Sequence, residues 1–351
     1  MSQKKTVIVQ LPAIARHSAI EERYALELEA LAPLADIVEI EAKSPRAFGQ
    51  AAAEADAIIT SWGVRINDEV IGQLKRCVVI GVGSVGVDMV DIAAATEAGI
   101  VVTNVPDVFI EEVADHAMML LLAAVRRTKQ MNQLSADGDW HRGRPILNSV
   151  PRLMGRTLGL LAFGNVARCV TRRARGFGLH VIAHDPYVSE LAISEADVEP
   201  VGFTELLERS DYLSIHAPLN AETHHQLDAK AFARMRPGAV VVNTARGPII
   251  SEVDLIDALV SGHIGAAGLD VLEQEPPAPD NPLLSMGNVI ITPHVASATT
   301  RMRPETRRRV GREVALVLRN RWPMSCVNPT VLPRVTLERW QPYPMNRGPN
   351  R

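Results

Sequence analysis

The feature that most constrains this chain is an alternation of short apolar runs with longer helical stretches, repeated along most of its 351 residues. The runs are rich in β-branched residues, as in TVIVQL and CVVIGVG, and alanine-rich stretches such as residues 19–34 separate them. This alternation predicts parallel sheets wrapped by helices. Because the chain is too long for one ordinary core, we expect two α/β domains, each built on a doubly wound parallel sheet.

The apolar runs fall into two series, joined near a predicted helix over residues 111–127. The runs of the second series are apolar on both faces, as central parallel strands must be. After about residue 330 the periodicity ends, which predicts an extended or disordered tail. The first series comprises residues 6–11, 36–40, 57–60 and 77–83, and the second comprises residues 157–163, 180–185, 212–219, 239–247, 265–271 and 288–294.

Charge and cysteine content argue against several classes of protein. The 37 basic and 40 acidic residues nearly cancel, so no nucleic-acid partner is expected. Cys77, Cys169 and Cys326 are odd in number and widely spaced, which favours a reduced, cytoplasmic protein without a disulfide framework. The amino-terminal segment lacks a signal peptide's long apolar region, and the apolar run at 117–125 is too short for a bilayer, so no membrane association is expected.

The segment GLLAFGNVA, residues 159–167, lies where an apolar run passes into a predicted helix over residues 165–178. It resembles the glycine fingerprint of dinucleotide sites, whose three glycines serve the tight turn, the approach of the pyrophosphate and helix–strand packing. Ala162, Gly164 and Ala167 occupy these places, so only the second glycine is kept. We expect the dinucleotide site to be retained, with a stiffer first turn.

An acidic residue follows at the spacing that a dinucleotide site requires. Asp185 lies 21 residues after Gly164, at the end of the next apolar run. A carboxylate there can accept both hydroxyls of a ribose and would repel a 2′-phosphate, which favours NAD over NADP. In the alternative interpretation, Asp185 only begins a turn before Pro186.

Three ionisable side chains follow three later runs of the second series: Arg246, Glu275 and His294. The carboxyl ends of parallel strands meet in the ligand crevice of an open sheet. An arginine can fork onto a carboxylate and polarise the adjacent carbonyl, while a histidine held by a glutamate can exchange a hydroxyl proton. Each residue alone could be structural, but the three together favour redox chemistry on a 2-hydroxy acid.

The order of the motifs HDPY, HAPL, NTARG, GLDV, EPP and TPH resembles that of the D-isomer-specific 2-hydroxyacid dehydrogenase family, over nearly the whole chain to about residue 330. Residues 104–122, 184–190 and 224–228 resemble its C-terminal binding protein branch most closely. The resemblance implies a Rossmann NAD-binding domain, a discontinuous flavodoxin-like substrate domain and a homodimer formed through the cofactor domain. The expected ranges are residues 104–295 for the first domain, 1–103 with 296–330 for the second, and 331–351 for the tail.

The resemblance also implies roles for individual residues. It assigns catalysis to Arg246, Glu275 and His294, the ribose to Asp185, and the nicotinamide carboxamide to Asp270. The remaining cofactor-binding residues that we expect are Gly164, Asn165 and Val166 at the pyrophosphate, with Pro186, Thr244 and Ala245 elsewhere along the cofactor.

Substrate-binding residues are expected mainly in the first series. Ser297 stands where the C-terminal binding proteins have a tryptophan, and Val82 where they have an arginine, so that branch's substrate preference does not transfer. We expect an apolar, uncharged pocket wall, in which Arg65 is the only basic residue of ITSWGVRIN and VGSVGVD, with burial of Trp62 in the core as the alternative. The predicted substrate-binding residues are Trp62, Val85, Gly86 and Arg246.

Two further features are given structural interpretations. The segment RMRPETRRRVGR, residues 301–312, contains six arginines, and we expect a solvated helix face interleaved with glutamates. His224 and His225 are adjacent, so they do not face one another on a helix, and no metal site is assigned.

Two classes of function remain open. The first is an NAD-dependent oxidoreductase that interconverts a 2-oxo acid and a D-2-hydroxy acid. The second is a dinucleotide-sensing scaffold that resembles the C-terminal binding proteins and has little turnover. Those proteins also retain the arginine, glutamate and histidine, so the three residues do not decide between the classes.

Overall fold

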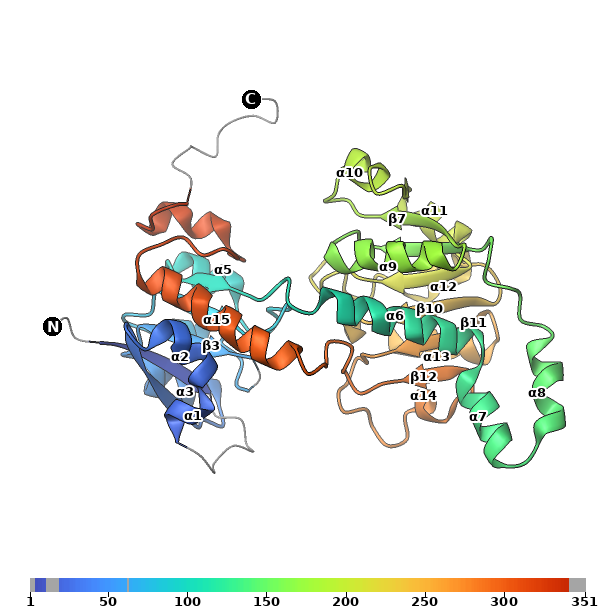
Figure 1. Cartoon of the computed structure of the whole chain (residues 1–351), viewed down its shortest axis with the longest axis horizontal. Helices are drawn as coiled ribbons and strands as arrows, with labels where there is room; N and C mark the ends of the chain where they lie inside the picture. The colour runs from blue at the N-terminus through green and yellow to red at the C-terminus, as the bar shows by residue number, and fades with distance from the viewer. Residues whose placement is uncertain (1–3, 11–18, 62, 341–351) are drawn as a thin grey trace. The chain divides into compact units, whose positions relative to one another are not determined.

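Two all-parallel sheets organise the chain in a computed structural model that describes residues 4–10, 19–61 and 63–340 (Figure 1). Each sheet belongs to its own compact unit. Unit 1 comprises residues 1–108 and 299–351, and unit 2 comprises residues 109–298. The expected fold class, two parallel-sheet α/β domains of which one is discontinuous in sequence, is confirmed.

The sheet of unit 1 has five strands in the order β2-β1-β3-β4-β5. Numbered along the chain this is the order 2-1-3-4-5, which is the flavodoxin-like arrangement. The strands are β1 (Lys5–Gln10), β2 (Ala35–Ile40), β3 (Ala57–Thr60), β4 (Val79–Val82) and β5 (Val101–Thr103).

Helices cover both faces of this sheet. Asp91 caps α5 by accepting a hydrogen bond from the Ala94 amide at 2.9 Å, so the chain turns into this helix soon after β4. The helices of unit 1 are α1 (Ile20–Arg23), α2 (Ala25–Leu31), α3 (Pro45–Ala52), α4 (Asp68–Ile71), α5 (Ile92–Glu97), α15 (Met302–Leu318) and the 3₁₀ helix η2 (Pro329–Arg334).

The arginine-rich helix α15 buries one face, so the solvated face that its sequence suggested is only part of its surface. It packs on α2 and against β4, where Val310 and Val314 lie over Gly81. Arg307, Arg308 and Arg309 pair with carboxylates of unit 1, among them Glu27 for Arg307. Arg303 and Arg312 are exposed. Part of this positive charge is therefore paired with carboxylates within the unit.

The chain after residue 330 continues the packing of unit 1. Val331 in η2 is fully buried, and the Trp340 indole N–H donates to the Trp322 carbonyl at 2.8 Å. An isolated bridge pairs Arg321 with Glu338. The described part of the predicted tail is thus packed on the unit, and residues 341–351 lie outside the described residues.

Unit 2 has a seven-stranded sheet in the order β12-β11-β10-β9-β6-β7-β8. The order reverses between β6 and β9, which is the topological switch point where dinucleotide-binding folds place their ligand. The strands are β6 (Thr157–Leu161), β7 (His180–His184), β8 (Glu199–Pro200), β9 (Tyr212–Ile215), β10 (Ala239–Asn243), β11 (Ile264–Leu269) and β12 (Val289–Ile291).

Two apolar layers, one on each face, bury this sheet. One layer lies under α6 and α9, and the other lies under α11, α12 and α13. Helices α7 and α8 form an arm that continues from the end of α6, and α8 packs mainly on α7 (Figure 1). The helices are α6 (Ile110–Val125), α7 (Thr128–Ala136), α8 (Trp140–Leu147), α9 (Asn165–Gly176), α10 (Glu190–Ser194), α11 (Phe203–Arg209), α12 (Ala229–Arg234), α13 (Glu252–Val260), α14 (Pro282–Ser285) and the 3₁₀ helix η1 (Gly247–Ile249).

Among the helices in the described ranges, none combines the length and the hydropathy that a membrane span requires.

Candidate active site

The turn after β6 adopts the backbone conformation that the missing first glycine would favour. Ala162 has φ 72°, in the left-handed region, and its amide donates to the His184 carbonyl at 2.8 Å. An L-residue in this region brings its Cβ close to the carbonyl oxygen, which costs about 1–2 kcal/mol. The alanine therefore preserves the shape of the fingerprint turn while storing backbone strain.

Helix α9 begins in a way that leaves its first amides available. Gly164 is the N-cap and supplies no side-chain acceptor, and a Cβ built on it would meet only open space. The first helical residues are Asn165 and Val166, while Ala167 is fully buried in the packing of α9 on the sheet. Amides at an uncapped helix N-terminus bind phosphate groups, so this turn fits a pyrophosphate.

Asp185 follows β7 and joins two turns at the same end of the sheet. Its carboxylate accepts hydrogen bonds from the amides of Phe163 and Tyr187, each at 2.8 Å. It therefore does begin the turn that contains Pro186, as in the alternative interpretation. A carboxylate has about four acceptor positions, so two amides do not exhaust it and ribose hydroxyls can also be accepted.

The predicted catalytic histidine and glutamate are in direct contact. His294 follows β12, and its Nδ1 lies 2.7 Å from Oε2 of Glu275, which follows the neighbouring strand β11. The other oxygen of Glu275 accepts from the Leu272 amide at 3.1 Å. Both side chains are about one third exposed, 33% for His294 and 36% for Glu275, so the pair can be reached from outside the unit.

Arg246 lies on the loop that follows β10, the next strand of the sheet. The Asn243 side chain shapes this loop by donating to the Arg246 carbonyl at 2.8 Å and accepting from the Ala245 amide at 2.9 Å. At Gly247 a Cβ would clash with the Leu272 carbonyl, so glycine lets this loop press against the one that holds Glu275. The three loops after β10, β11 and β12 thus meet at one edge.

Two predicted cofactor residues lie in the same region. The hydroxyl oxygen of Thr244 is buried and has no partner within the described protein, which leaves a polar atom available to a cofactor. Asp270 directly follows β11 and is 2% exposed. Its carboxylate accepts from the Thr292 hydroxyl at 2.5 Å and from the amides of Val295 and Ala296 at 2.9 and 2.8 Å.

The predicted substrate-binding residues other than Arg246 belong to unit 1. Val85 is 43% exposed on the loop after β4, and its carbonyl accepts from the Asn104 amide group at 2.8 Å. The hydroxyl of Ser84 donates to the Gly86 carbonyl at 2.7 Å, so the serine folds this loop back on itself. Trp62 lies outside the described residues.

Two residues at this site had no predicted role. Thr292 lies between the Asp270 carboxylate and His116 of α6, whose Nε2 is 2.8 Å from the threonine hydroxyl. Thr292 belongs to the TPH motif and His116 to residues 104–122, which both carry the family resemblance, but that resemblance assigned neither residue a role. Within the described ranges, no group of three or more histidine, cysteine, aspartate or glutamate residues could hold a metal ion.

Sequence comparison identifies relatives of the chain. Residues 118–296 match the family described as "D-isomer specific 2-hydroxyacid dehydrogenase, NAD binding domain". A glyoxylate reductase of Korarchaeum cryptofilum is 37% identical over 80% of this chain and 84% of its own length. A D-3-phosphoglycerate dehydrogenase of Methanocaldococcus jannaschii is 38% identical over 83% of this chain. The chain spans only 55% of the latter protein's length.

Solved structures share the architecture. The glyoxylate reductase of Paecilomyes thermophila superposes with a TM-score of 0.80 at 29% identity, covering 92% of this chain and 98% of that one. A D-lactate dehydrogenase from Aquifex aeolicus, complexed with NAD and lactic acid, superposes with a TM-score of 0.77 at 26% identity, covering 89% and 95% of the two chains.

Proposed function

Because the chain belongs to the D-isomer specific 2-hydroxyacid dehydrogenase family, we propose that it is an NAD-dependent oxidoreductase that interconverts a 2-oxo acid and a D-2-hydroxy acid. The observation that supports this most directly is the 2.7 Å contact between His294 and Glu275 at the carboxyl ends of β11 and β12. Arg246 follows the adjacent strand β10, so an anion-binding group and a proton-transferring pair share one edge of the sheet.

The cofactor would bind across the switch point of the unit 2 sheet. The amides of Asn165 and Val166, which follow the N-cap residue Gly164, would bind its pyrophosphate. Asp185 with Pro186 would bind the adenosine ribose. Thr244, Ala245 and Asp270 lie on the loops after β10 and β11, where the nicotinamide end would extend. When bound, NADH supplies the hydride that reduces the substrate carbonyl.

The side chains of the site would bind the substrate and transfer the proton. In the direction of reduction, the Arg246 guanidinium binds the carboxylate of the 2-oxo acid and polarises the neighbouring carbonyl. Since Glu275 binds Nδ1 of His294, the other ring nitrogen, Nε2, gives its proton to the carbonyl oxygen as carbon 2 receives the hydride. In the reverse direction the same nitrogen takes the hydroxyl proton.

We propose that the substrate side chain is apolar. Val85 and Gly86 of unit 1 would contribute to the substrate pocket together with Trp62. Within ITSWGVRIN and VGSVGVD, Arg65 is the only basic residue that could bind a second acidic group. This favours acids such as pyruvate or phenylpyruvate over those with a phosphate or a second carboxylate.

A panel of 2-oxo acids tests the function. NADH oxidation is measured with pyruvate, phenylpyruvate, glyoxylate, oxaloacetate and 3-phosphohydroxypyruvate, and the reverse reaction is measured with both enantiomers of the best product. We expect efficient turnover of at least one apolar acid and of its D-product alone. Slow turnover of every acid, with tight NADH binding, would favour the dinucleotide-sensing scaffold.

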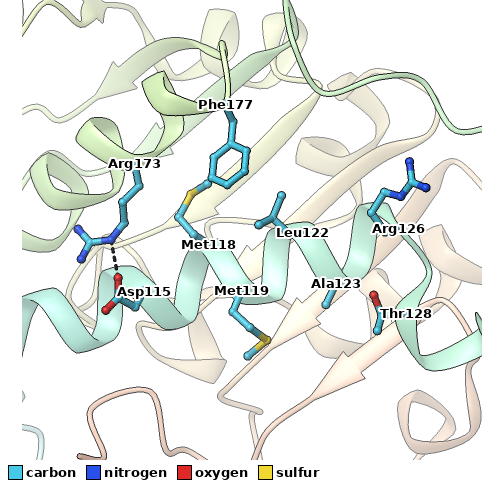
Figure 2. A pocket seen from close by; sticks show the side chains of 9 residues that line it. All are labelled: Asp115, Met118, Met119, Leu122, Ala123, Arg126, Thr128, Arg173 and Phe177. Carbon is cyan, nitrogen blue, oxygen red and sulfur yellow. Dashed lines mark hydrogen bonds and ion pairs between the residues drawn. The ribbon is translucent and has the colours of Figure 1, made fainter. Parts of the chain in front are cut away.

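We further propose that a second copy of this chain packs on α6 of unit 2. Met118, Met119, Leu122 and Phe177 line one pocket beside α6. Figure 2 shows Met118 and Leu122 on the side of α6 nearer Phe177, and Met119 on the other side of the helix. Met119 and Phe177 are 41% and 43% exposed. The arm of α7 and α8 adds Trp140, which is 77% exposed, and can supply the further area that a stable dimer needs.

Light scattering after size exclusion tests the dimer. The parent is expected to have twice the mass of one chain, and Met119→Glu is expected to be a monomer because it places a charge in the pocket beside α6. Met154→Glu is the control, since Met154 is exposed outside that pocket. A monomeric parent would contradict the proposal.

A reduced, cytoplasmic location is also proposed. Cys77, Cys169 and Cys326 are all unpaired. Burial raises the pKa of the Cys77 thiol to about 12 and that of Cys326 to about 11, which keeps them protonated and unreactive. Titration of the denatured protein, purified without reductant, is expected to find three free thiols.

A further inference from the structure

The buried Asp270 carboxylate is bound to the backbone that carries the catalytic histidine. Its Oδ1 accepts from the Val295 amide at 2.9 Å, and its Oδ2 accepts from the Ala296 amide at 2.8 Å. The main-chain carbonyl of Asp270 also accepts from the His294 amide at 2.8 Å. Three successive amides, from His294 to Ala296, are therefore held by one residue.

This backbone needs to be held. His294 has φ 53°, in the left-handed region that residues other than glycine rarely adopt. Such a conformation persists only where the surrounding structure over-determines it. The amide contacts from Asp270 supply that constraint, and they set the direction in which the imidazole leaves the chain toward Glu275.

The Asp270 carboxylate is itself held in place from the side of α6. The Thr292 hydroxyl donates to its Oδ1 at 2.5 Å, since an ionised carboxylate can only accept. With its single hydrogen used, the threonine oxygen must be the acceptor in its 2.8 Å contact with Nε2 of His116. His116 therefore carries its proton on Nε2 and donates it, and this ring nitrogen also lies 3.5 Å from Oδ1 of Asp270.

We propose that His116 and Thr292 are positioning residues that act through Asp270 to fix the backbone and ring direction of His294. The inference rests on the proposed function, in which His294 exchanges the substrate proton. In the chain of contacts, α6 orients Thr292, Thr292 fixes the carboxylate of Asp270, and that carboxylate holds the turn of His294. No residue other than His294 in this chain of contacts needs to touch the substrate.

The role of the Thr292 hydroxyl is distinct from ordinary burial of a threonine. Thr103 is fully buried in β5, and its hydroxyl has no hydrogen-bond partner within the described protein. Replacement of Thr103 by valine removes a buried hydroxyl of unit 1 without breaking a hydrogen bond. Thr103→Val is therefore the matched control for Thr292→Val, which removes the same group from the chain of contacts.

The first experiment measures kcat on the best 2-oxo acid together with the Kd of NADH from its fluorescence. Thr292→Val is expected to lower kcat roughly 10- to 100-fold, because small displacements of a reacting group have effects of that size. The Kd of NADH is expected to stay unchanged. Thr292→Ser, which keeps the hydroxyl, is expected to restore kcat, and Thr103→Val is expected to have the parent's kcat.

Variants of His116 test the next contact. A glutamine can present an amide N–H near the place of Nε2, whereas leucine cannot donate. We expect His116→Leu to lower kcat and His116→Gln to retain most of it. The double variant His116→Leu with Thr292→Val is expected to lose little more than Thr292→Val alone, because residues in one chain of contacts are not additive.

A measurement without cofactor or substrate separates this inference from the proposed function. Amide hydrogen exchange of residues 292–298 is followed by mass spectrometry in the free protein, with residues 157–161 of β6 as the internal reference. Thr292→Val and His116→Leu are expected to speed exchange of the Val295 and Ala296 amides at least about tenfold, through local opening. The reference peptide is expected to stay protected.

Each outcome decides the matter. Parent-like kcat and exchange in folded Thr292→Val would overturn the positioning role, as would failure of Thr292→Ser to restore kcat. A loss confined to NADH affinity would assign Asp270 to cofactor binding alone. If the parent turns over none of the acids, the proposed function fails, while the exchange rates still decide whether Thr292 and His116 hold the His294 turn.

Discussion

The two sides of the unit 2 sheet end in different kinds of chemistry. At β6 and β7 the groups available to a ligand are the backbone amides at the start of α9, together with Asp185, which is hydrogen-bonded to nearby amides. At β11 and β12 the groups are side chains bound to one another, as in the contact between His294 and Glu275. Backbone amides survive most substitutions, whereas a side-chain pair is lost when one member is replaced. We call the ends of β6 and β7 the cofactor side and the ends of β11 and β12 the catalytic side, after their proposed roles. We expect the cofactor side to tolerate sequence change better than the catalytic side.

The largest effect is expected from replacing the side chains of the catalytic side. His294→Ala and Arg246→Ala should each lower kcat about 10²- to 10⁴-fold, the usual contribution of a general acid, while NADH still binds. Steady-state kinetics and NADH fluorescence check this. His180→Ala is the control, because this exposed histidine begins β7 at the opposite end of the strands. Turnover near the parent's in either variant would remove the assigned roles.

A half-buried histidine lies between the two sides and gives a pH-dependent test. His216 follows β9, its Nε2 is 2.9 Å from the Ser214 hydroxyl, and burial lowers its pKa to about 4. The unfolded chain, with an ordinary histidine pKa near 6.5, takes up the proton first as the pH falls. The contribution of neutral His216 to stability is thus complete above about pH 6.5 and is lost progressively toward pH 4.

Replacing this histidine should therefore flatten the acid side of the stability profile. Between pH 7 and pH 4 the parent is expected to lose up to about 3 kcal/mol more unfolding free energy than His216→Asn. Urea unfolding at several pH values measures the difference, with the exposed His180→Asn as the control. Parallel profiles of the parent and His216→Asn would show that the imidazole is solvated and that the switch point is open to water.

The cofactor side is expected to discriminate between cofactors through one charge. The parent should prefer NADH to NADPH, because Asp185 would face the added phosphate in the proposed site and HDPYVSE contains no lysine or arginine. Asp185→Ser should reduce that preference roughly tenfold, in the range expected for removing one repulsive charge at the surface. Ratios of kcat/KM for the two cofactors measure it. An unchanged ratio would mean that the carboxylate serves only the Phe163 and Tyr187 amides.

The sequence predicts features that follow its apolar runs, but it does not predict roles that arise from contacts between distant segments. The alternation of apolar runs predicts both sheets, because central parallel strands must be apolar. Arg246, Glu275 and His294 are recognisable because each follows an apolar run. The role of Thr292 is not, since a threonine beside a proline has no periodic signal and acquires its role only from contacts across α6 and β11.

Helix α15 shows a second kind of limit. Six arginines among twelve residues suggested a solvated face, yet Arg307 binds Glu27, which lies 280 residues earlier in the chain. A local pattern measures charge, but it contains no information on the carboxylates that the fold brings to it. The predicted helix over residues 19–34 is similarly divided into α1 and α2 at Tyr24, which packs in the core.

The smallest effect tests whether the cofactor side depends on backbone shape alone. Ala162 has φ 72°, so Ala162→Gly relieves the left-handed strain of an L-residue, and part of this gain is offset by the greater entropy of glycine in the unfolded chain. We expect a net stabilisation of about 0.5–1 kcal/mol, measured by urea unfolding. The affinity for NADH should be unchanged or tighter, because the turn keeps its geometry.

Ala167→Gly is the matched control: this alanine lies in right-handed helix α9 and is fully buried, so the same substitution should destabilise. A large loss of NADH affinity in Ala162→Gly would mean that the alanine methyl shapes the site, and the contrast between a backbone side and a side-chain side would then fail.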